Sequence, residues 1–203
     1  RETGLRSKQP GQHRYRVPKV ERPDIPNLLD RQFQPERINQ VWCGDITYIW
    51  TGARWVYLAV VLDLYARCVV GWAMSERPDA DWVCTALDQA WQQRGKPKGV
   101  LFHSDQGYQY GSRLFRQRLW RYQIMQSMSR RGCCWDNAPM ERLFRSLKTE
   151  WIPKLGYGSL DEANRDVGMY LMAYYNWQRP RSTNTGAPPA VEEKQLNLLS
   201  EIC

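Results

Sequence analysis

Three apolar runs follow one another in the chain: WCGDITYIW (residues 42–50), RWVYLAVVLDLY (54–65) and ARCVVGWAMS (66–75). All three are rich in Val, Ile, Tyr and Trp, which are enriched in β-strands. The short segments Thr51-Gly52-Ala53 and Asp63-Leu64-Tyr65 mark the turns between them. The pattern predicts three consecutive antiparallel strands.

The segments after these strands alternate between helical and strand patterns. Apolar residues at helical spacing predict a helix after Pro78, and others predict helices over 112–122, from Pro139 to Lys148 and over 160–177. Short apolar runs at 99–102 and 124–128 predict two further strands, and a Pro-rich tail covers 179–189. The order predicts an α/β fold in which helices flank a five-stranded mixed sheet, with three antiparallel strands and then two more.

The composition and the lengths of the apolar runs argue against a disordered chain, a membrane-spanning protein and a secreted protein. The 203 residues are 42% hydrophobic and 25% charged, which is typical of one globular domain with appendages. The longest strongly apolar run, 57–62, is far shorter than the roughly 20 residues of a membrane-spanning helix, and no signal peptide opens the chain. The six cysteines form no C-x-x-C pair and only two histidines are present, which favours a reduced, cytoplasmic protein without structural zinc.

The charge distribution favours a polyanionic partner. The net charge is +8, and residues 111–150 alone contain nine Lys or Arg against three acids. Residues 1–40 are rich in Pro, Arg and Gln, contain nine Lys or Arg against five acids and lack a helical or strand period. This segment is predicted to be an extended basic arm, which either is a solvated linker or contacts phosphates.

Two aspartates stand at positions where a carboxylate is unexpected or commonly functional. Asp45 lies inside an apolar strand, where an unpaired buried carboxylate would cost several kcal/mol. Asp105 follows the short strand that ends at His103 and Ser104, and open α/β sheets commonly place ligand-binding residues there. Either carboxylate could instead cap a loop or pair with an arginine.

Glu141 lies in the first turn of the helix that Pro139 opens. Helical geometry places Glu141, Arg145 and Lys148 on one face, beside the apolar stripe that would face the core. The alternative is an ordinary helix-terminal glutamate with an i,i+4 partner, which contributes a few tenths of a kcal/mol. His103 is predicted to pack in the core, as are Trp55, Trp72, Trp82 and Trp91.

Four motifs resemble one protein family: WCGDITYIW (42–50), HSDQGYQYGS (103–112), SMSRRGCCWDNAPMERLFRSLKTEW (127–151) and YYNWQRP (174–180). Over residues 24–192 the sequence resembles the DDE transposases of bacterial insertion sequences, and specifically the second-frame product of the type made from two overlapping reading frames. That family is related to the retroviral integrase core, so the resemblance implies a ribonuclease-H-like fold. It also implies that Asp45, Asp105 and Glu141, with 35 residues between the last two, are the catalytic and metal-binding residues.

The implied chemistry agrees with elementary electrostatics. Carboxylates 4 Å apart repel by roughly 4 kcal/mol per pair at an effective dielectric constant of 20. Two Mg²⁺ or Mn²⁺ ions would remove that penalty and could serve an in-line displacement at phosphorus. The resemblance implies that water cuts a strand at the end of the element and that the freed 3′-hydroxyl then attacks another phosphodiester.

The resemblance also implies partners and DNA contacts. The expected partners are the double-stranded DNA of element ends and target, further copies of the chain and the first-frame protein, with no membrane, in the bacterial cytoplasm at the nucleoid. Lys148, seven residues after the glutamate, is implied to contact terminal DNA, and Arg130, Arg131 and Arg145 are weaker candidates for phosphate contacts. Each arginine could instead lie on a solvated face. Trp135 is predicted to be exposed and could stack on an unpaired base.

The expected organisation has three parts: the basic arm (1–40), an integrase-like catalytic core (41–155) and a C-terminal helical extension with the Pro-rich tail (156–203). Family members usually carry an N-terminal helix-turn-helix segment, and nothing before Gln40 supplies two such helices. Arg181 also stands where the family often has a histidine. Two alternatives to an active transposase remain: a catalytically silent DNA-binding or oligomerisation fragment that regulates the full-length enzyme, and a nuclease with hydrolytic activity alone.

Overall fold

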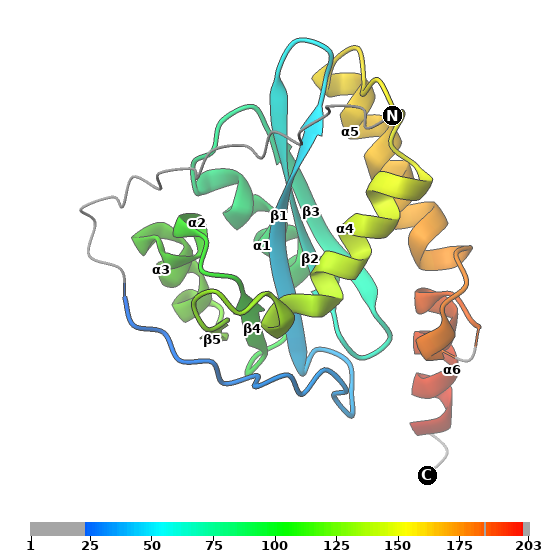
Figure 1. Cartoon of the computed structure of the whole chain (residues 1–203). Helices are drawn as coiled ribbons and strands as arrows, with labels where there is room; N and C mark the ends of the chain where they lie inside the picture. The colour runs from blue at the N-terminus through cyan, green and yellow to red at the C-terminus, as the bar shows by residue number, and fades with distance from the viewer. Residues whose placement is uncertain (1–22, 185, 201–203) are drawn as a thin grey trace, which may run out of the picture.

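A five-stranded mixed sheet forms the centre of the molecule in the computed structural model, which describes residues 23–184 and 186–200 (Figure 1). The strand order is β3-β2-β1-β4-β5, with β1, β2 and β3 antiparallel and with β4 parallel to both β1 and β5. The predicted fold class and all five predicted strands are therefore confirmed. The strands are β1 (Val41–Trp50), β2 (Trp55–Asp63), β3 (Cys68–Ser75), β4 (Leu101–Ser104) and β5 (Met125–Met128).

Helices pack on both faces of this sheet (Figure 1). The predicted helix over 160–177 is present as α5 followed by the π-helical segment η2. The sequence analysis did not predict α6. No helix in the described segments combines the length and apolarity needed to cross a membrane. The helices are α1 (Asp81–Gln93), α2 (Tyr108–Gly111), α3 (Arg113–Arg121), η1 (Cys134–Asn137), α4 (Ala138–Glu150), α5 (Leu160–Met169), η2 (Tyr170–Tyr175), η3 (Ser182–Asn184) and α6 (Pro189–Ser200).

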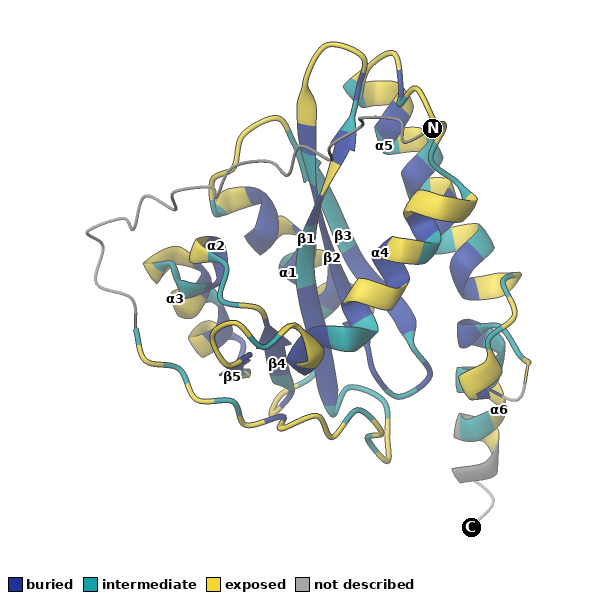
Figure 2. Ribbon diagram, in the orientation of Figure 1, coloured by how far each residue is buried: buried dark blue, intermediate teal, exposed yellow. Residues whose placement is uncertain are grey.

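The core consists of two apolar clusters, one on each face of the sheet. Because side chains alternate between the faces of a strand, neighbouring residues of β1 and β2 enter different clusters. This explains why β2 is a continuous apolar run, which Figure 2 shows as buried along most of its length. Helices α4 and α5 and segment η2 cover one face, and α1 and α3 cover the other. The first cluster includes Cys43, Leu58, Val60, Leu62, Met140, Leu143, Leu147, Val167 and Leu171, and the second Trp42, Ala59, Val61, Val83, Leu87, Phe115 and Leu119.

One of the four tryptophans predicted to build the core does not do so. Trp82 is buried, and Trp72 and Trp91 are partly buried against the two clusters. Trp55 is 57% exposed and packs edge to face on Trp50, its partner across the β1–β2 hairpin. The prediction for Trp55 is wrong because the alternation of the strand directs the next residue, Val56, into the core.

The last part of the predicted arm packs against the sheet. The backbone N–H groups of Leu28 and Leu29 donate to Ser127 Oγ (2.9 and 3.2 Å), and Pro26 O accepts from Met128 N (3.2 Å). Leu29 is buried in the first cluster. This segment therefore covers β5, which is an edge strand and would otherwise present unpaired backbone groups. Seven of the nine basic residues of the arm lie in 1–22, outside the described residues.

Candidate active site

Strands β1 and β4 bring Asp45 and Asp105 together. The two strands are parallel neighbours, and Gly44 pairs with Ser104, so the residues that follow lie side by side. Gly44 permits this packing, because a Cβ atom there would lie 2.4 Å from Phe102 Cζ. Asp45 points to the same face as Cys43, which is the face covered by α4.

Helix α4 brings Glu141 to the same place. Its buried residues Met140, Leu143 and Leu147 fix the helix against the sheet and leave Glu141 exposed in the first turn. Asp45, Asp105 and Glu141 then line one cavity of about 470 Å³, which we call the carboxylate cleft. Gln106, Ser129, Asn137 and the loop 130–134 complete its wall. The three predicted catalytic residues, from three distant segments, are therefore neighbours in space.

No positive charge compensates these carboxylates directly. Among the described residues, none of the three forms an ion pair within 4 Å. Burial, together with the negative charges of Asp105 and Glu141, raises the pKa of Asp45 to about 8, and Lys148 partly opposes this shift. Burial likewise raises the pKa of Asp105. Although Arg130 lines the cleft, its charge is paired with Asp136 and Asp30, so the three carboxylates have no ion-pair partner within the described residues.

The donor atoms of the cleft fit a hard divalent ion. Asp45 Oδ1 accepts from the N–H of Ile46 (2.7 Å), and Asp105 Oδ1 accepts from the N–H of Gly107 (2.9 Å); the described residues offer no hydrogen bond to the second oxygen of either carboxylate. Asn137 Oδ1 is buried in the same wall and has no hydrogen-bond partner in the part of the chain that the structure describes. Oxygen ligands of this kind suit Mg²⁺ and Mn²⁺. Within the described segments, no three His, Cys, Asp or Glu side chains lie close enough together to form a group that could hold a metal ion.

Asp136 is a structural centre beside the cleft that the sequence analysis missed. Its fully buried carboxylate accepts from Arg130 Nε (2.9 Å), Arg31 Nε (2.7 Å) and Asn27 Nδ2 (3.0 Å). These partners, Arg130 first, hold the pKa of Asp136 well below its usual range. The network ties the loop before α4 to residues 27–31 and so fixes the wall of the cleft. Arg31 and Asn27 lie more than 100 residues away in sequence, so no local spacing could reveal them.

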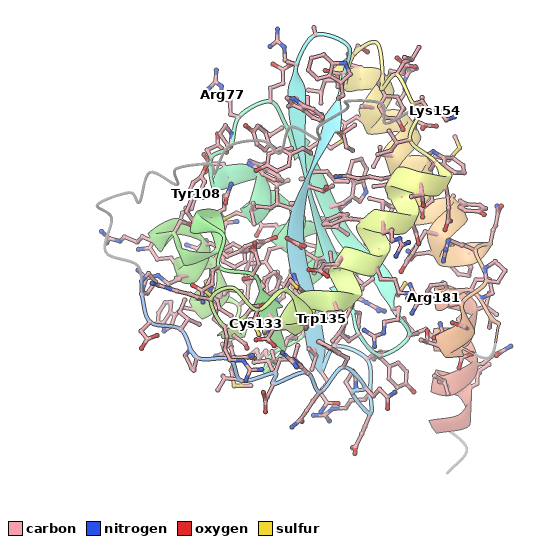
Figure 3. The ribbon with its side chains drawn as sticks, viewed as in Figure 1. Arg77, Tyr108, Cys133, Trp135, Lys154 and Arg181 are labelled. Atoms are coloured by element: carbon pink, nitrogen blue, oxygen red, sulfur yellow. The ribbon has the colours of Figure 1, made fainter. Side chains whose placement is uncertain are left out.

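The predicted DNA-binding residues lie around the mouth of the cleft, with one difference. Arg131, Arg145 and Lys148 are exposed and form no ion pair in the described part of the chain. Trp135 is 68% exposed at the N-terminal end of α4 (Figure 3), as predicted. Arg130 is instead engaged with Asp136 and, at 3.4 Å, with Asp30.

His103 packs, as predicted. Its ring lies between Ser127 Oγ (2.8 Å from Nδ1) and Ser129 Oγ (3.2 Å from Nε2), and burial lowers its pKa to about 4. His103 therefore links β4 to β5 and to the loop that follows β5.

The comparison of sequences finds integrase cores and transposases. The family described as integrase core domain matches residues 35–134 and 122–189. The transposase InsF for insertion sequence IS3A of Escherichia coli (strain K12) is 42% identical over 171 residues, which are 84% of this chain and 59% of that protein. The putative transposase InsO for insertion sequence element IS911B of the same strain is 58% identical over 104 residues, 51% of this chain and 52% of that protein. The chain thus spans little more than half the length of these relatives.

Solved structures share the fold. The catalytic core domain of HTLV-2 integrase, solved in complex with magnesium, superposes with a TM-score of 0.58 at 18% identity and covers 79% of this chain and 99% of its own. A chain of the simian T-cell lymphotropic virus intasome gives a TM-score of 0.61 at 18% identity, over 87% of this chain and 60% of its own. Retroviral integrase cores have the ribonuclease-H-like fold, which confirms the predicted architecture. The chain therefore belongs to the transposases of bacterial insertion sequences that have an integrase-like core.

Proposed function

We propose that this chain is the catalytic part of a DDE transposase, which cuts DNA strands at the ends of an insertion sequence and joins them to target DNA. The observation that carries the proposal is that Asp45, Asp105 and Glu141 line one cavity and have no ion-pair partner among the residues that the structure describes. A fold that only needed these residues for stability would pair them, as it pairs Asp136. The two transposase relatives from Escherichia coli support the same reaction.

Asp45 and Asp105 are proposed to hold divalent ions, and Glu141 to complete the second of two sites. The magnesium in the HTLV-2 integrase core supports this choice of ion. Two Mg²⁺ or Mn²⁺ ions bound there would stabilise the attacking and the leaving oxygen of an in-line displacement at phosphorus. Asn137 adds an amide oxygen to the donor set from the wall of the cleft.

The residues around the cleft are proposed to position DNA. Lys148 lies close enough to Asp45 to lower its pKa, so its charge reaches the mouth of the cleft. Arg145 and Arg131 are free to contact phosphates, Arg130 adds its charge while holding Asp136, and Trp135 offers an exposed ring to an unpaired base. Binding through such contacts weakens as salt rises.

The assembly and organisation follow from the same proposal. The substrates are double-stranded element ends and target DNA, bridged by several copies of the chain, with the first-frame protein as a further partner, at the nucleoid in the bacterial cytoplasm. We propose that residues 41–155 form the catalytic core and that residues 156–203 extend it. Residues 1–40 are proposed to be a basic arm that links the core to a DNA-recognition region. The silent regulatory fragment is not favoured, because all three carboxylates are present and meet.

A strand-transfer assay tests the proposal. The purified chain is incubated with labelled linear DNA carrying candidate element ends in Mg²⁺, in Mn²⁺ and in a chelator, beside the Glu141→Gln and Glu36→Gln variants. Glu36 is exposed and its carboxylate has no ion-pair partner in the described structure, so it is a matched control for the loss of one charge. Joined products are expected with either metal for the wild type and for Glu36→Gln, and for no other sample. Joining by Glu141→Gln, or in the chelator, would overturn the proposal.

A further inference from the structure

A second cavity lies on the other flank of α4. It has a volume of about 150 Å³, and we call it the arginine pocket. Its lining comes from α4 and from the segment that follows η2: Arg142, Arg179, Pro180, Arg181, Ser182 and Thr183. It shares no lining residue with the carboxylate cleft.

The arginines of this pocket exceed the carboxylates available to them. Arg179 pairs with both oxygens of Glu150, at 2.6 Å each. Arg181 donates to the hydroxyl of Tyr175, and Arg142 is exposed; neither has a carboxylate partner among the described residues.

Arg67 adds a fourth cation behind the pocket. Its Nη2 donates to Phe33 O (2.7 Å), but its Nη1 is buried and finds no hydrogen-bond partner within residues 23–184 and 186–200. Asn184 Nδ2 donates to Ala66 O (2.9 Å) and so holds the η3 turn against the segment that carries Arg67. Among the described residues, Glu150 is the one carboxylate that forms an ion pair with any of these four arginines.

The positive charges act on one another. Burial, and then the charges of Arg179 and Arg142, lower the pKa of Arg181. Burial, together with the charges of Arg181 and Arg142, also lowers the pKa of Arg67. Partly buried like charges are unfavourable unless an anion compensates them. Within the described residues Glu150 compensates Arg179, but no carboxylate pairs with Arg142, Arg181 or Arg67, which leaves the position open to an external anion.

A groove along α4 connects this pocket to the carboxylate cleft. The groove has a volume of about 510 Å³ and is lined by Trp135, Glu141 and Arg145, and also by Arg142 and Arg179. Glu141 is shared with the cleft, and Arg142 and Arg179 are shared with the arginine pocket. In Figure 3, Trp135 lies at the start of α4 and Arg181 lies beside the same helix, towards the C-terminal segment.

We propose that the arginine pocket binds a backbone phosphate of the DNA strand whose neighbouring part lies in the carboxylate cleft. The guanidinium groups offer paired donors that match phosphate oxygens, and Ser182 adds a hydroxyl donor. The pocket is small and polar, so it takes a phosphate rather than a base. This inference rests on the proposed function, because it assumes that DNA occupies the cleft.

Binding of a fluorescent DNA duplex in a chelator, where metal-dependent cutting cannot occur, tests the inference. The variants are Arg142→Gln, Arg181→Gln and, as a matched control, Arg77→Gln, which removes an exposed arginine that lies far from α4 (Figure 3) and has no side-chain partner in the described structure. The two pocket variants are each expected to weaken binding about 3–10-fold and to reduce the slope of log affinity against log salt by about one unit. Arg77→Gln is expected to bind like the wild type.

Thermal unfolding checks that the variants fold. Arg181→Gln removes the hydrogen bond to the Tyr175 hydroxyl and could unfold for that reason. In that case Arg142→Gln decides the test, because Arg142 is exposed and the described structure gives it no such contact. If Arg142→Gln and Arg181→Gln bind the duplex with the affinity and the salt dependence of Arg77→Gln, the inference is overturned. The same unfolding measurement is repeated with inorganic phosphate. If the pocket variants lose the stabilisation that phosphate gives the wild type but bind DNA as tightly as the wild type, the pocket binds an anion that is not the DNA backbone.

The strand-transfer assay separates the two proposals. A wild type that joins DNA while the pocket variants bind normally contradicts the arginine pocket alone. A wild type that binds through the pocket but joins no DNA contradicts the transposase reaction alone.

Discussion

Two carboxylate environments, that of Asp136 in η1 and that of Asp45 in the carboxylate cleft, have opposite properties. Asp136 is fully buried and accepts hydrogen bonds from Arg130, Arg31 and Asn27, which keep its pKa well below the usual range. Asp45 faces Asp105 and Glu141 and accepts one hydrogen bond, from its own neighbour Ile46, and its pKa rises to about 8.

The difference supports the separate roles that we propose for the two sites. Where the fold needs a buried carboxylate for structure, it supplies cations from two segments of the chain. Where it gathers three carboxylates, the described structure supplies none within ion-pair distance, which leaves the charge for a metal ion. Unpaired charge of one sign is therefore the feature that the two proposed functional positions share: it is negative in the carboxylate cleft and positive in the arginine pocket.

The largest expected effect comes from Asp45→Asn. Strand joining should fall by about three orders of magnitude or more, because a ligand of the proposed ions is lost. The free energy of unfolding should stay constant or rise, since the repulsion between Asp45 and its neighbours is removed. Product formation on labelled DNA and chemical denaturation measure the two quantities. If Asp45→Asn joins DNA normally, or if it is strongly destabilised, the role of Asp45 is structural, like that of Asp136.

Asp136→Asn should show the reverse pattern in stability. The free energy of unfolding should fall by about 2 kcal/mol, because charge-assisted hydrogen bonds to a buried group are lost while the released arginines remain near solvent. Asp30→Asn is the matched control, because Asp30 is exposed and contacts Arg130 only at 3.4 Å. Its effect should stay below about 0.5 kcal/mol. Equal effects of the two variants would contradict a structural role specific to Asp136.

Acid should remove the difference between the wild type and Asp136→Asn. The pKa of Asp136 is lower in the folded than in the unfolded protein, so its contribution to stability is complete above pH about 4 and declines as the pH falls towards the folded pKa. Urea denaturation of both proteins from neutral pH to acid measures it. A difference that grew on acidification would refute the assignment of the lowered pKa to the native network.

A smaller stabilisation is expected from metal. At ten times its dissociation constant, Mg²⁺ should raise the free energy of unfolding by about 1.4 kcal/mol, because it binds the folded carboxylate cleft. Asp105→Asn should abolish this gain, whereas Asp136→Asn should retain it. Thermal unfolding with increasing Mg²⁺ measures both. A gain that survives in Asp105→Asn would place the metal outside the cleft.

The sequence predicts the elements whose signals are local. The apolar runs at 42–75 were sufficient to predict three strands. The pairing of Gly44 in β1 with Ser104, the last residue of β4, explains why Asp45 and Asp105 lie side by side. Glu141 could be placed because the apolar stripe of α4 fixes which face it presents. Trp55 was misplaced, since composition alone does not reveal which face a residue at the start of a strand takes.

Features that combine distant segments could not be predicted. The Asp136 network joins residues about 105 positions apart, and the arginine pocket joins α4, the segment after η2 and, behind it, Arg67. Helix α6 has too weak an amphipathic pattern to stand out from the Pro-rich tail, and its Glu193 pairs with Arg94 of the segment that ends α1. In each case the partner is known only once the chain has folded.

Anomalous diffraction from crystals grown with Mn²⁺ tests the central claim most directly. The account predicts manganese peaks between Asp45, Asp105 and Glu141, with these side chains drawn together, and no peak at Asp136. Manganese bound elsewhere, with Asp45 and Asp105 unliganded at saturating Mn²⁺, would contradict it.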